Sequence, residues 1–585
     1  MNVKTLVVAL ISVLLACNAA PPKEDLDLTR GGRVEVFFND PGTRMENLWE
    51  PDAVSVMVDV IDRTRATLDF AVMGFNRDEV ADAIIRAFDR GVKIRMVGDS
   101  DHLYNSGYQR MIDRHIPIVT GNGNHIMHDK FLISDDRFLF AGTANWSDTD
   151  LRHNSNNFVL IDSPPVAADF KAEFEQMFSG KFGHMKEEIL NGRSYTVGDT
   201  EVEVWFSPNE DAMGRILEYV DAAQESIRFT IFAFTKDQVG SAYIRKQEQF
   251  ALWDEQDGVD IANTPFRERR SVAGMIDQSQ LHSNGQYHEV FRLLGAGIPL
   301  QMDGNDNSKH PGDYQAGGGR LHSKTMVIDA YGENPVVITG SFNWSASATV
   351  SNDEFLLVLK GPRVAQMFDD YFELLWADGR RMGNTHLSDG NINPGDVVIN
   401  EVHWYGVNDR DPDGFDEFIE LRNLTDQDIS LDLWQIANED DFVVGLPPGS
   451  TIPANGLFTI VDHVLEPYED GKPQDENSAF LTGDLIVNSF NDNRQARLYL
   501  KDGTLDLRLK DPSAAIVDVA GDGGAAFAGG PIGGKVYSME RTSDPGEGTD
   551  PASWYTCEAP TGGTNVNPDF RNDIIATPGE SNSRE

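Results

Sequence analysis

Two stretches of the chain repeat one pattern of polar residues. The first is His128-Asp-Lys130-Phe-Leu-Ile-Ser-Asp135, followed by Gly142-Thr-Ala-Asn145-Trp-Ser147, and the second is His322-Ser-Lys324-Thr-Met-Val-Ile-Asp329, followed by Gly340-Ser-Phe-Asn343-Trp-Ser345. Each reads H-x-K-x4-D and then G-[ST]-x-N-W-S. One short motif arises easily by chance, but two complete copies that are each followed by the same second motif do not. The sequence therefore indicates a duplicated domain.

The surroundings of both motifs alternate between strand-like and helix-like patterns. In the first half, strand-like runs at 34–38, 68–73 and 92–97 alternate with helical patterns at 53–66 and 79–90. The second half repeats this order with runs at 202–206 and 227–234 around a helical pattern at 211–226. This alternation predicts an α/β fold with a sheet covered on both faces. We expect two lobes, residues 33–190 and 200–379, packed as a pair because two copies are too few for a solenoid.

The pattern changes after residue 379. Residues 380–395 are polar and predict a linker, and from 396 short alternating apolar runs and turn residues predominate. This is typical of an all-β sandwich, which we expect over residues 396–582. Cys557 is expected to be a packed small apolar residue.

An acidic stretch in this region has the spacing of a calcium-binding loop. Asp409, Asp411, Asp413, Gly414 and Glu420 match the positions of an EF-hand loop. An EF-hand continues into a helix, whereas residues 418–421 have strand character. We interpret the stretch as an acidic hairpin loop, and calcium binding there stays open.

The N-terminus predicts export. Residues 1–16 contain Lys4 and then an apolar run too short to span a membrane, which is typical of a secretory signal. The run ends in Leu-Leu-Ala-Cys17, which resembles a bacterial lipoprotein cleavage box and implies an acylated Cys17, a tether over 17–32 and a place in the cell envelope. Because Asn18 follows, the outer membrane is expected. The alternative is an ordinary cleaved signal with an incidental cysteine.

Net charge restricts the partners. The chain has 49 lysine and arginine residues against 94 aspartate and glutamate residues, a formal charge of −45. A general nucleic-acid binder normally presents a basic face, so the charge argues against that class. We interpret the acidity as an adaptation to a saline habitat.

The paired motifs resemble those of the phospholipase D superfamily, and the C-terminal region resembles the lamin-tail domain, an immunoglobulin-like sandwich. The first resemblance implies a phosphodiesterase in which one histidine attacks phosphorus to form a covalent phosphohistidine. The other protonates the leaving oxygen and then takes a proton from water, or from an alcohol in transphosphatidylation. By this resemblance His128 is favoured as the nucleophile and His322 as the acid.

The residue types suit this chemistry. Residues i and i+2 of a strand share a face, so each histidine should lie beside its lysine. Lys130, Lys324, Asn145 and Asn343 can donate hydrogen bonds to the non-bridging oxygens of a phosphodiester, so we expect no metal and no cofactor.

Four further residues receive supporting roles. Asp135 and Asp329 lie five residues beyond their lysines, on the opposite face, and are assigned structural or supporting roles. The resemblance also implies a downstream acceptor for each imidazole, and the chain offers Glu354 in the second lobe and Asn157 in the first.

The leading hypothesis is therefore a lipid-anchored phospholipase D-type hydrolase that cleaves phospholipid head groups to phosphatidate and an alcohol. The alternatives are a nuclease of the same superfamily or a phosphatidyl transferase. A non-enzymatic adhesion or scaffold protein would predict a degraded motif in one lobe, and neither motif is degraded. A monomer is expected because both half-sites lie in one chain.

Overall fold

The structure, a computed structural model, describes residues 32–39, 51–121, 125–189, 194–261, 263–284, 288–304, 319–383, 385–405, 416–438, 442–462, 479–487, 498, 500, 504–558, 563–568, 570 and 572–584. The predicted signal sequence, Cys17, most of the tether and residues 409–415 of the acidic loop lie outside these ranges. The chain divides into two compact units. The first holds both lobes, up to Ser279 and again over Gln301–Arg380, and the second holds Gln280–Leu300 and the chain from Arg381.

The first lobe is built on a seven-stranded sheet in the order β1-β7-β6-β5-β2-β3-β4. Its strands are β1 (Val34–Asn39), β2 (Thr67–Val72), β3 (Lys93–Gly98), β4 (Ile118–Thr120), β5 (Lys130–Ser134), β6 (Phe138–Gly142) and β7 (Asn156–Asp162). β2, β3 and β4 run parallel to one another, and the remaining neighbours are antiparallel.

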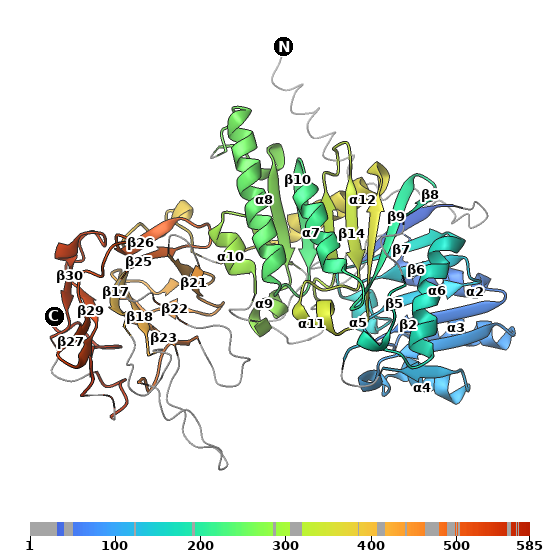
Figure 1. Cartoon of the computed structure of the whole chain (residues 1–585), viewed down its shortest axis with the longest axis horizontal. Helices are drawn as coiled ribbons and strands as arrows, with labels where there is room; N and C mark the ends of the chain where they lie inside the picture. The colour runs from blue at the N-terminus through green and yellow to red at the C-terminus, as the bar shows by residue number, and fades with distance from the viewer. Residues whose placement is uncertain are drawn as a thin grey trace. The chain divides into compact units, whose positions relative to one another are not determined.

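The second lobe repeats this order and extends it at both edges. Its nine-stranded sheet runs β16-β12-β11-β10-β13-β14-β15-β9-β8, so the span from β12 to β9 matches β4 to β1 strand for strand. Figure 1 shows both sheets, with β9, β10 and β14 labelled in the second lobe and β2, β5, β6 and β7 in the first. The strands are β8 (Ser194–Val197), β9 (Thr200–Ser207), β10 (Ser226–Ile231), β11 (Ser271–Ile276), β12 (Leu300–Met302), β13 (Lys324–Ile328), β14 (Val336–Gly340), β15 (Glu354–Lys360) and β16 (Arg380–Arg381). The repeat read from the sequence is therefore a repeat of sheet topology.

Helices cover both faces of the first sheet, as the sequence predicts. α2 (Ala53–Arg63), α3 (Asp78–Asp89) and α4 (Ser106–Asp113) supply apolar residues to the core on one face, and α6 (Pro164–Phe178) to the core on the other. In the second lobe α7 (Ala212–Ala222) packs beside α8 (Asp237–Gln256), and α12 (Pro362–Asp378) packs on the sheet.

Two helices end earlier than their periodicity predicts. The pattern over 53–66 becomes a helix that ends at Arg63, and the pattern over 211–226 becomes one that ends at Ala222. The amides that would continue these helices are bound elsewhere: Asp135 accepts from Arg65, Ala66 and Thr67, and Asp329 accepts from residues 224–226. A distant carboxylate therefore sets each boundary.

The two lobes share one hydrophobic core. α6 of the first lobe packs on β9 as well as on its own sheet, and α12 of the second packs on β1. Phe170 on α6 lies 5.0 Å from Phe131, 5.1 Å from Phe206 and 5.4 Å from Phe355, measured between ring centroids. Burying each such ring contributes about 1.5–3 kcal/mol. The lobes are thus one packed body, as expected for a pair.

The second unit is rich in β-strands, as predicted. A six-stranded sheet, β24-β23-β18-β17-β29-β30, and a four-stranded sheet, β21-β20-β25-β26, enclose a core that includes Leu421, Trp434 and Ile460. The strands are β17 (Val397–His403), β18 (Phe418–Asn423), β20 (Gln435–Ala437), β21 (Phe442–Gly445), β23 (Leu457–Val461), β24 (Leu485–Ile486), β25 (Asp506–Lys510), β26 (Ile516–Gly521), β29 (Met539–Arg541) and β30 (Trp554–Thr556). Among the described residues no helix is long and apolar enough to cross a membrane.

Candidate active site

Backbone pairing between the lobes brings the two motifs together. The amide of His128 donates to the carbonyl oxygen of Asp353 (2.9 Å), and the amide of Asp353 donates to the carbonyl oxygen of Ile126 (3.0 Å). The second motif repeats this arrangement. The amide of His322 donates to the carbonyl oxygen of Ser155 (2.9 Å), and the amide of Ser155 donates to the carbonyl oxygen of Arg320 (2.8 Å). Each histidine is therefore held by the lobe to which it does not belong.

Each lysine lies beside its own histidine, although the strand begins later than the motif suggests. β5 begins at Lys130 and β13 at Lys324, so the histidines lie in the extended segments that precede these strands. The Nζ of each lysine donates to the carbonyl oxygen of the histidine two residues before it. Both lysines are almost completely buried.

His128 is paired with a carboxylate from the second lobe. Its Nδ1 lies 2.6 Å from Oε2 of Glu354, which begins β15 and has no exposed surface. This contact leaves Nε2 as the ring nitrogen that can react. The sequence named Glu354 as an acceptor, and the structure shows that it serves the imidazole of the opposite lobe.

His322 is paired with an amide, and the residue is Asn156 rather than Asn157. Nδ1 of His322 lies 3.3 Å from Oδ1 of Asn156 and 3.8 Å from Oδ1 of Asp150. The predicted role of Asn157 is therefore wrong, since its amide binds Thr325 (2.8 Å) and Thr339 (2.6 Å) instead.

The error has a simple cause. Matching Phe158 to Phe355 in the sequence aligns Asn157 with Glu354, but β7 begins at Asn156 just as β15 begins at Glu354. One residue along a strand reverses the face on which a side chain lies.

The two asparagines of the second motif are fixed by backbone amides. Oδ1 of Asn145 accepts from the amide of Gly74 (3.2 Å), and Oδ1 of Asn343 accepts from Ala233 (3.3 Å). Both side chains are partly exposed, and the NH2 end of each is directed away from that contact. The neighbouring tryptophans are buried, and the serines Ser147 and Ser345 cap short helices.

Asp135 and Asp329 have structural positions. Each carboxylate accepts three backbone amides at the far end of the strand that begins with the motif lysine, at distances of 2.7–3.0 Å. Both residues have positive φ, 52° and 50°. Of the two roles that the sequence left open, the geometry supports the structural one.

Burial dominates the electrostatics. It lowers the pKa of His128, while Glu354 acts in the opposite direction. Burial, then Lys324 and Lys130, hold the pKa of His322 well below its usual value. Burial lowers the pKa of Lys324 to about 7 and that of Lys130 to about 8. Each imidazole thus experiences the charge of the lysine in the opposite lobe, as one shared site requires.

An ionic cluster supports the segment that holds His128. Nζ of Lys186 contacts Glu173 and lies 2.8 Å from Oδ1 of Asp353, and all three side chains are buried. Asp129, between His128 and Lys130, is completely buried beside this cluster, and burial raises its pKa well above the usual value. No sequence pattern indicates this cluster, because its members come from four separate segments.

An aromatic side chain also borders the site. The ring of Phe232 lies 4.7 Å from that of His322, with Nζ of Lys324 4.9 Å and Cζ of Arg320 5.6 Å from its centroid. Phe232 follows β10, and Arg320 precedes His322 by two residues. Neither residue is part of a motif, so the motifs predict neither, although strand alternation places Arg320 on the side of His322.

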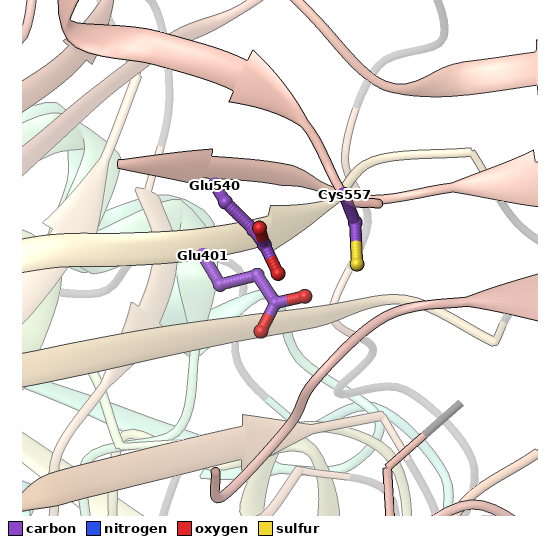
Figure 2. A group of neighbouring side chains, drawn as sticks. All are labelled: Glu401, Glu540 and Cys557. Atoms are coloured by element: carbon purple, nitrogen blue, oxygen red, sulfur yellow. The ribbon is translucent and has the colours of Figure 1, made fainter. Parts of the chain in front are cut away.

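One group of potential metal ligands occurs elsewhere in the described residues. Glu401, Glu540 and Cys557 of the second unit have ligand atoms within 4.8 Å of one another (Figure 2). The carboxylates already accept hydrogen bonds: Glu401 from Ser538 and Thr577, and Glu540 from Thr577 (2.7 Å) and Ser583. Their oxygens serve a buried hydrogen-bond network, and Cys557 is buried as expected.

The fold and the site define a duplicated α/β protein with a histidine and a lysine from each lobe at one junction. Residues 57–178 and 216–376 match the family described as cardiolipin synthase, PLD-like domain, and residues 391–522 match the lamin tail domain. The two lobes therefore belong to the phospholipase D superfamily, and the C-terminal region contains a lamin tail domain.

Curated relatives include proteins named mitochondrial cardiolipin hydrolase. The protein from Drosophila melanogaster is 28% identical over 147 residues, 21% of this chain and 58% of its own length. The protein from Homo sapiens is 26% identical over 155 residues, 25% of this chain and 62% of its own length. This chain thus spans about three fifths of the length of these relatives.

Solved structures to which parts of this chain are similar include that of the phospholipase D family member Nuc from Salmonella typhimurium. It is 25% identical, covers 31% of this chain and 97% of its own, and has a TM-score of 0.23. Phosphatidylserine synthase from Haemophilus influenzae is 10% identical, covers 58% of this chain and 86% of its own, and has a TM-score of 0.40.

Proposed function

We propose that this protein is a phospholipase D-type phosphodiesterase that cleaves phospholipid head groups to phosphatidate and an alcohol through a covalent phosphohistidine, without a metal. The observation that carries the proposal is the pair of imidazoles held across the lobe junction, one on Glu354 (2.6 Å) and the other on Asn156 (3.3 Å).

His128 is assigned as the nucleophile. Attack on phosphorus by Nε2 leaves positive charge on the ring, and a carboxylate at Nδ1 stabilises that charge more than an amide does. Glu354 is completely buried, where its interaction with the ring is screened little by solvent. This pairing supports the same assignment as the resemblance.

His322 is assigned as the general acid and base. With an amide partner its imidazolium is less stabilised, so a proton on Nε2 passes readily to the leaving oxygen. Burial and two lysines lower its pKa, and the negative charge of a bound phosphodiester acts in the opposite direction. After the alcohol departs, the neutral ring takes a proton from water as water attacks the phosphohistidine.

Four donors stabilise the charge that develops on the phosphoryl oxygens. Lys130 and Lys324 supply ammonium groups, and Asn145 and Asn343 supply NH2 groups that are oriented because the carbonyl ends bind backbone amides. Preorganised donors of this kind contribute most of the catalysis in many phosphoryl transfers.

A phospholipid is the favoured substrate. The relatives named cardiolipin hydrolase act on a phospholipid by their names, and the net charge of −45 disfavours a polyanionic nucleic acid. An acyl chain on Cys17 would also keep the site near a bilayer. Nuclease and phosphatidyl transferase activities are the alternatives.

The test uses the full chain with phosphatidylcholine, phosphatidylglycerol and cardiolipin vesicles and with plasmid DNA, in the presence of EDTA. We expect release of alcohol from at least one lipid and no nicking of DNA. Cleavage of DNA alone would replace the proposal with the nuclease, and loss of turnover in EDTA would contradict a metal-independent reaction.

The two histidine roles are separated with bis(p-nitrophenyl) phosphate, whose leaving group needs little acid assistance. His322→Asn should release about one p-nitrophenol per enzyme and then stop, because hydrolysis of the phosphohistidine needs the base. His128→Asn should release none. A burst from His128→Asn would reverse the assignment.

A further inference from the structure

The duplication allows residue-by-residue comparison of the two halves of the site. Met127 pairs with Asp353 and Leu321 with Ser155, so residues 126–130 and 320–324 occupy equivalent positions. Side chains alternate along an extended segment, so the residue two before each histidine lies on the side of that histidine. That residue is Ile126 in the first lobe and Arg320 in the second.

These two positions differ in chemistry. Ile126 is 44% exposed and apolar, whereas Arg320 is partly buried and carries a permanent positive charge. The residue directly after β10 in the second lobe also differs from the residue directly after β2 in the first lobe. It is Phe232 in the second lobe and Met73 in the first. This equivalence follows from Ala233 and Gly74, whose amides bind the two motif asparagines.

Arg320 and Phe232 lie together on the His322 side. The guanidinium Cζ is 5.6 Å from the centre of the Phe232 ring, and that ring is 4.7 Å from His322. After burial, the two lysines and His128, the charge of Arg320 also lowers the pKa of His322. An aromatic ring and a guanidinium therefore border the imidazole assigned to protonate the leaving oxygen.

The direction of attack on phosphorus determines which part of the substrate lies beside Phe232 and Arg320. In phosphoryl transfer the attacking and leaving atoms are roughly in line through phosphorus. With attack from His128, the departing alcohol leaves on the side of His322, toward Arg320 and Phe232. The phosphatidyl group stays on His128 in this step, and the proton of His322 goes to the departing oxygen.

We propose that Arg320, positioned by Phe232, forms a leaving-group subsite that selects phosphodiesters whose departing alcohol carries a negative charge. The inference rests on the proposed function and deepens it, because it assigns specificity to a residue outside both motifs. The equivalent apolar position, Ile126, supplies no such selectivity.

The experiment compares cardiolipin, whose departing alcohol carries a phosphodiester anion, with phosphatidylglycerol, whose departing alcohol is neutral glycerol. Both lipids are presented at equal mole fraction in micelles of a neutral detergent, and kcat/KM is measured for the full chain. The quantity of interest is the ratio of the two kcat/KM values. We expect Arg320→Gln to lower this ratio about tenfold, the scale of one partly buried ion pair.

Two matched variants separate charge from structure. Arg320→Lys keeps the charge and should keep most of the ratio, and Ile126→Gln changes the equivalent position and should leave the ratio unaltered. An unaltered ratio in Arg320→Gln, or a loss of equal size in Arg320→Lys or Ile126→Gln, would overturn the subsite.

A measurement on the unmodified protein guards against a variant that fails to fold. Raising NaCl from about 0.05 to 0.5 M shortens the screening length, so the ratio should fall if a partly exposed charge selects the alcohol. A ratio independent of salt would contradict the proposal. Turnover of neither lipid contradicts the proposed function itself, whereas turnover of both with an unaltered ratio in Arg320→Gln contradicts only the subsite.

Discussion

The two imidazoles differ in the group that each faces at Nδ1. His128 faces the carboxylate of Glu354, and His322 faces the amide of Asn156, with Asp150 slightly farther away at 3.8 Å. The carboxylate stabilises positive charge on its ring more than the amide does. In the proposed reaction this difference gives the two duplicated motifs distinct roles.

Replacement of the Glu354 carboxylate tests the assignment of His128 as the nucleophile. Glu354→Gln should lower kcat about 100-fold, the scale of losing a group that orients and charges an imidazole. The burst of p-nitrophenol should slow by a similar factor, because the change acts on the attack. Asn156→Asp is the matched variant, and it should affect hydrolysis of the intermediate more than its formation. A Glu354→Gln variant with an unaltered burst rate would remove the assigned role.

The buried lysines predict the pH dependence. Burial lowers the pKa of Lys324 to about 7 and of Lys130 to about 8, so each ammonium is charged below its pKa and neutral above it. kcat/KM should therefore fall as pH rises through this range. On the acid side it should fall only below the ordinary pKa of an imidazole, because burial lowers the pKa of His128 and its neutral form is depleted below that lowered pKa. A profile of kcat/KM from pH 4 to 10 should be bell-shaped, and a steady rise to pH 10 would contradict it.

At the scale of elements, the carboxylates of Asp135 and Asp329 join the end of a motif strand to the turn that precedes a neighbouring strand. Each binds three amides and adopts a positive φ, a conformation for which aspartate is better suited than most residues. These contacts shape the sheet far from the imidazoles.

Their loss should affect stability rather than chemistry. Asp135→Ala and Asp329→Ala should each lower the free energy of unfolding by about 3 kcal/mol, because charge-assisted hydrogen bonds are lost and backbone amides are left unpaired. Urea unfolding measures this change, and the pH profile of the folded variants should keep its shape. Asp135→Asn retains one acceptor oxygen and should lower the free energy of unfolding by less than Asp135→Ala does. A shifted pH profile would point to a role in the site.

The same contacts explain which parts of the fold were predictable. Strand and helix cores follow from local periodicity, so β1, β2, β3 and α3 lie within about one residue of their predicted ranges. The ends of α2 and α7 depend on carboxylates about 70 to 100 residues further along the chain, which no local pattern contains. Asn156 was missed for a related reason, since the face of a strand depends on a register that only pairing reveals.

At the scale of the whole molecule, the division of the chain does not follow the order of the sequence. Gln280–Leu300 lies between strands of the second lobe in the sequence but belongs to the same compact unit as the lamin tail domain. Within that unit α10 (Val290–Gly295) packs against β20 and β21, and Phe291 is buried. The polar linker predicted over 380–395 begins beside the division at Arg380 and Arg381. Composition could not assign Gln280–Leu300, because burial of α10 depends on strands that lie more than 100 residues later.

Gly445 provides the test of this arrangement. A Cβ at this position would lie 2.2 Å from Cδ1 of Phe291, so Gly445→Ala forces the α10 ring out of its place. Overpacking of this kind should cost about 1–3 kcal/mol, and calorimetry of the full chain should show it in the unfolding of the second unit. Gly563→Ala, where the nearest atom is 3.4 Å away, is the matched control and should change little. If Gly445→Ala were as stable as Gly563→Ala, α10 would not be packed on this sheet, and Gln280–Leu300 would have no place in the second unit.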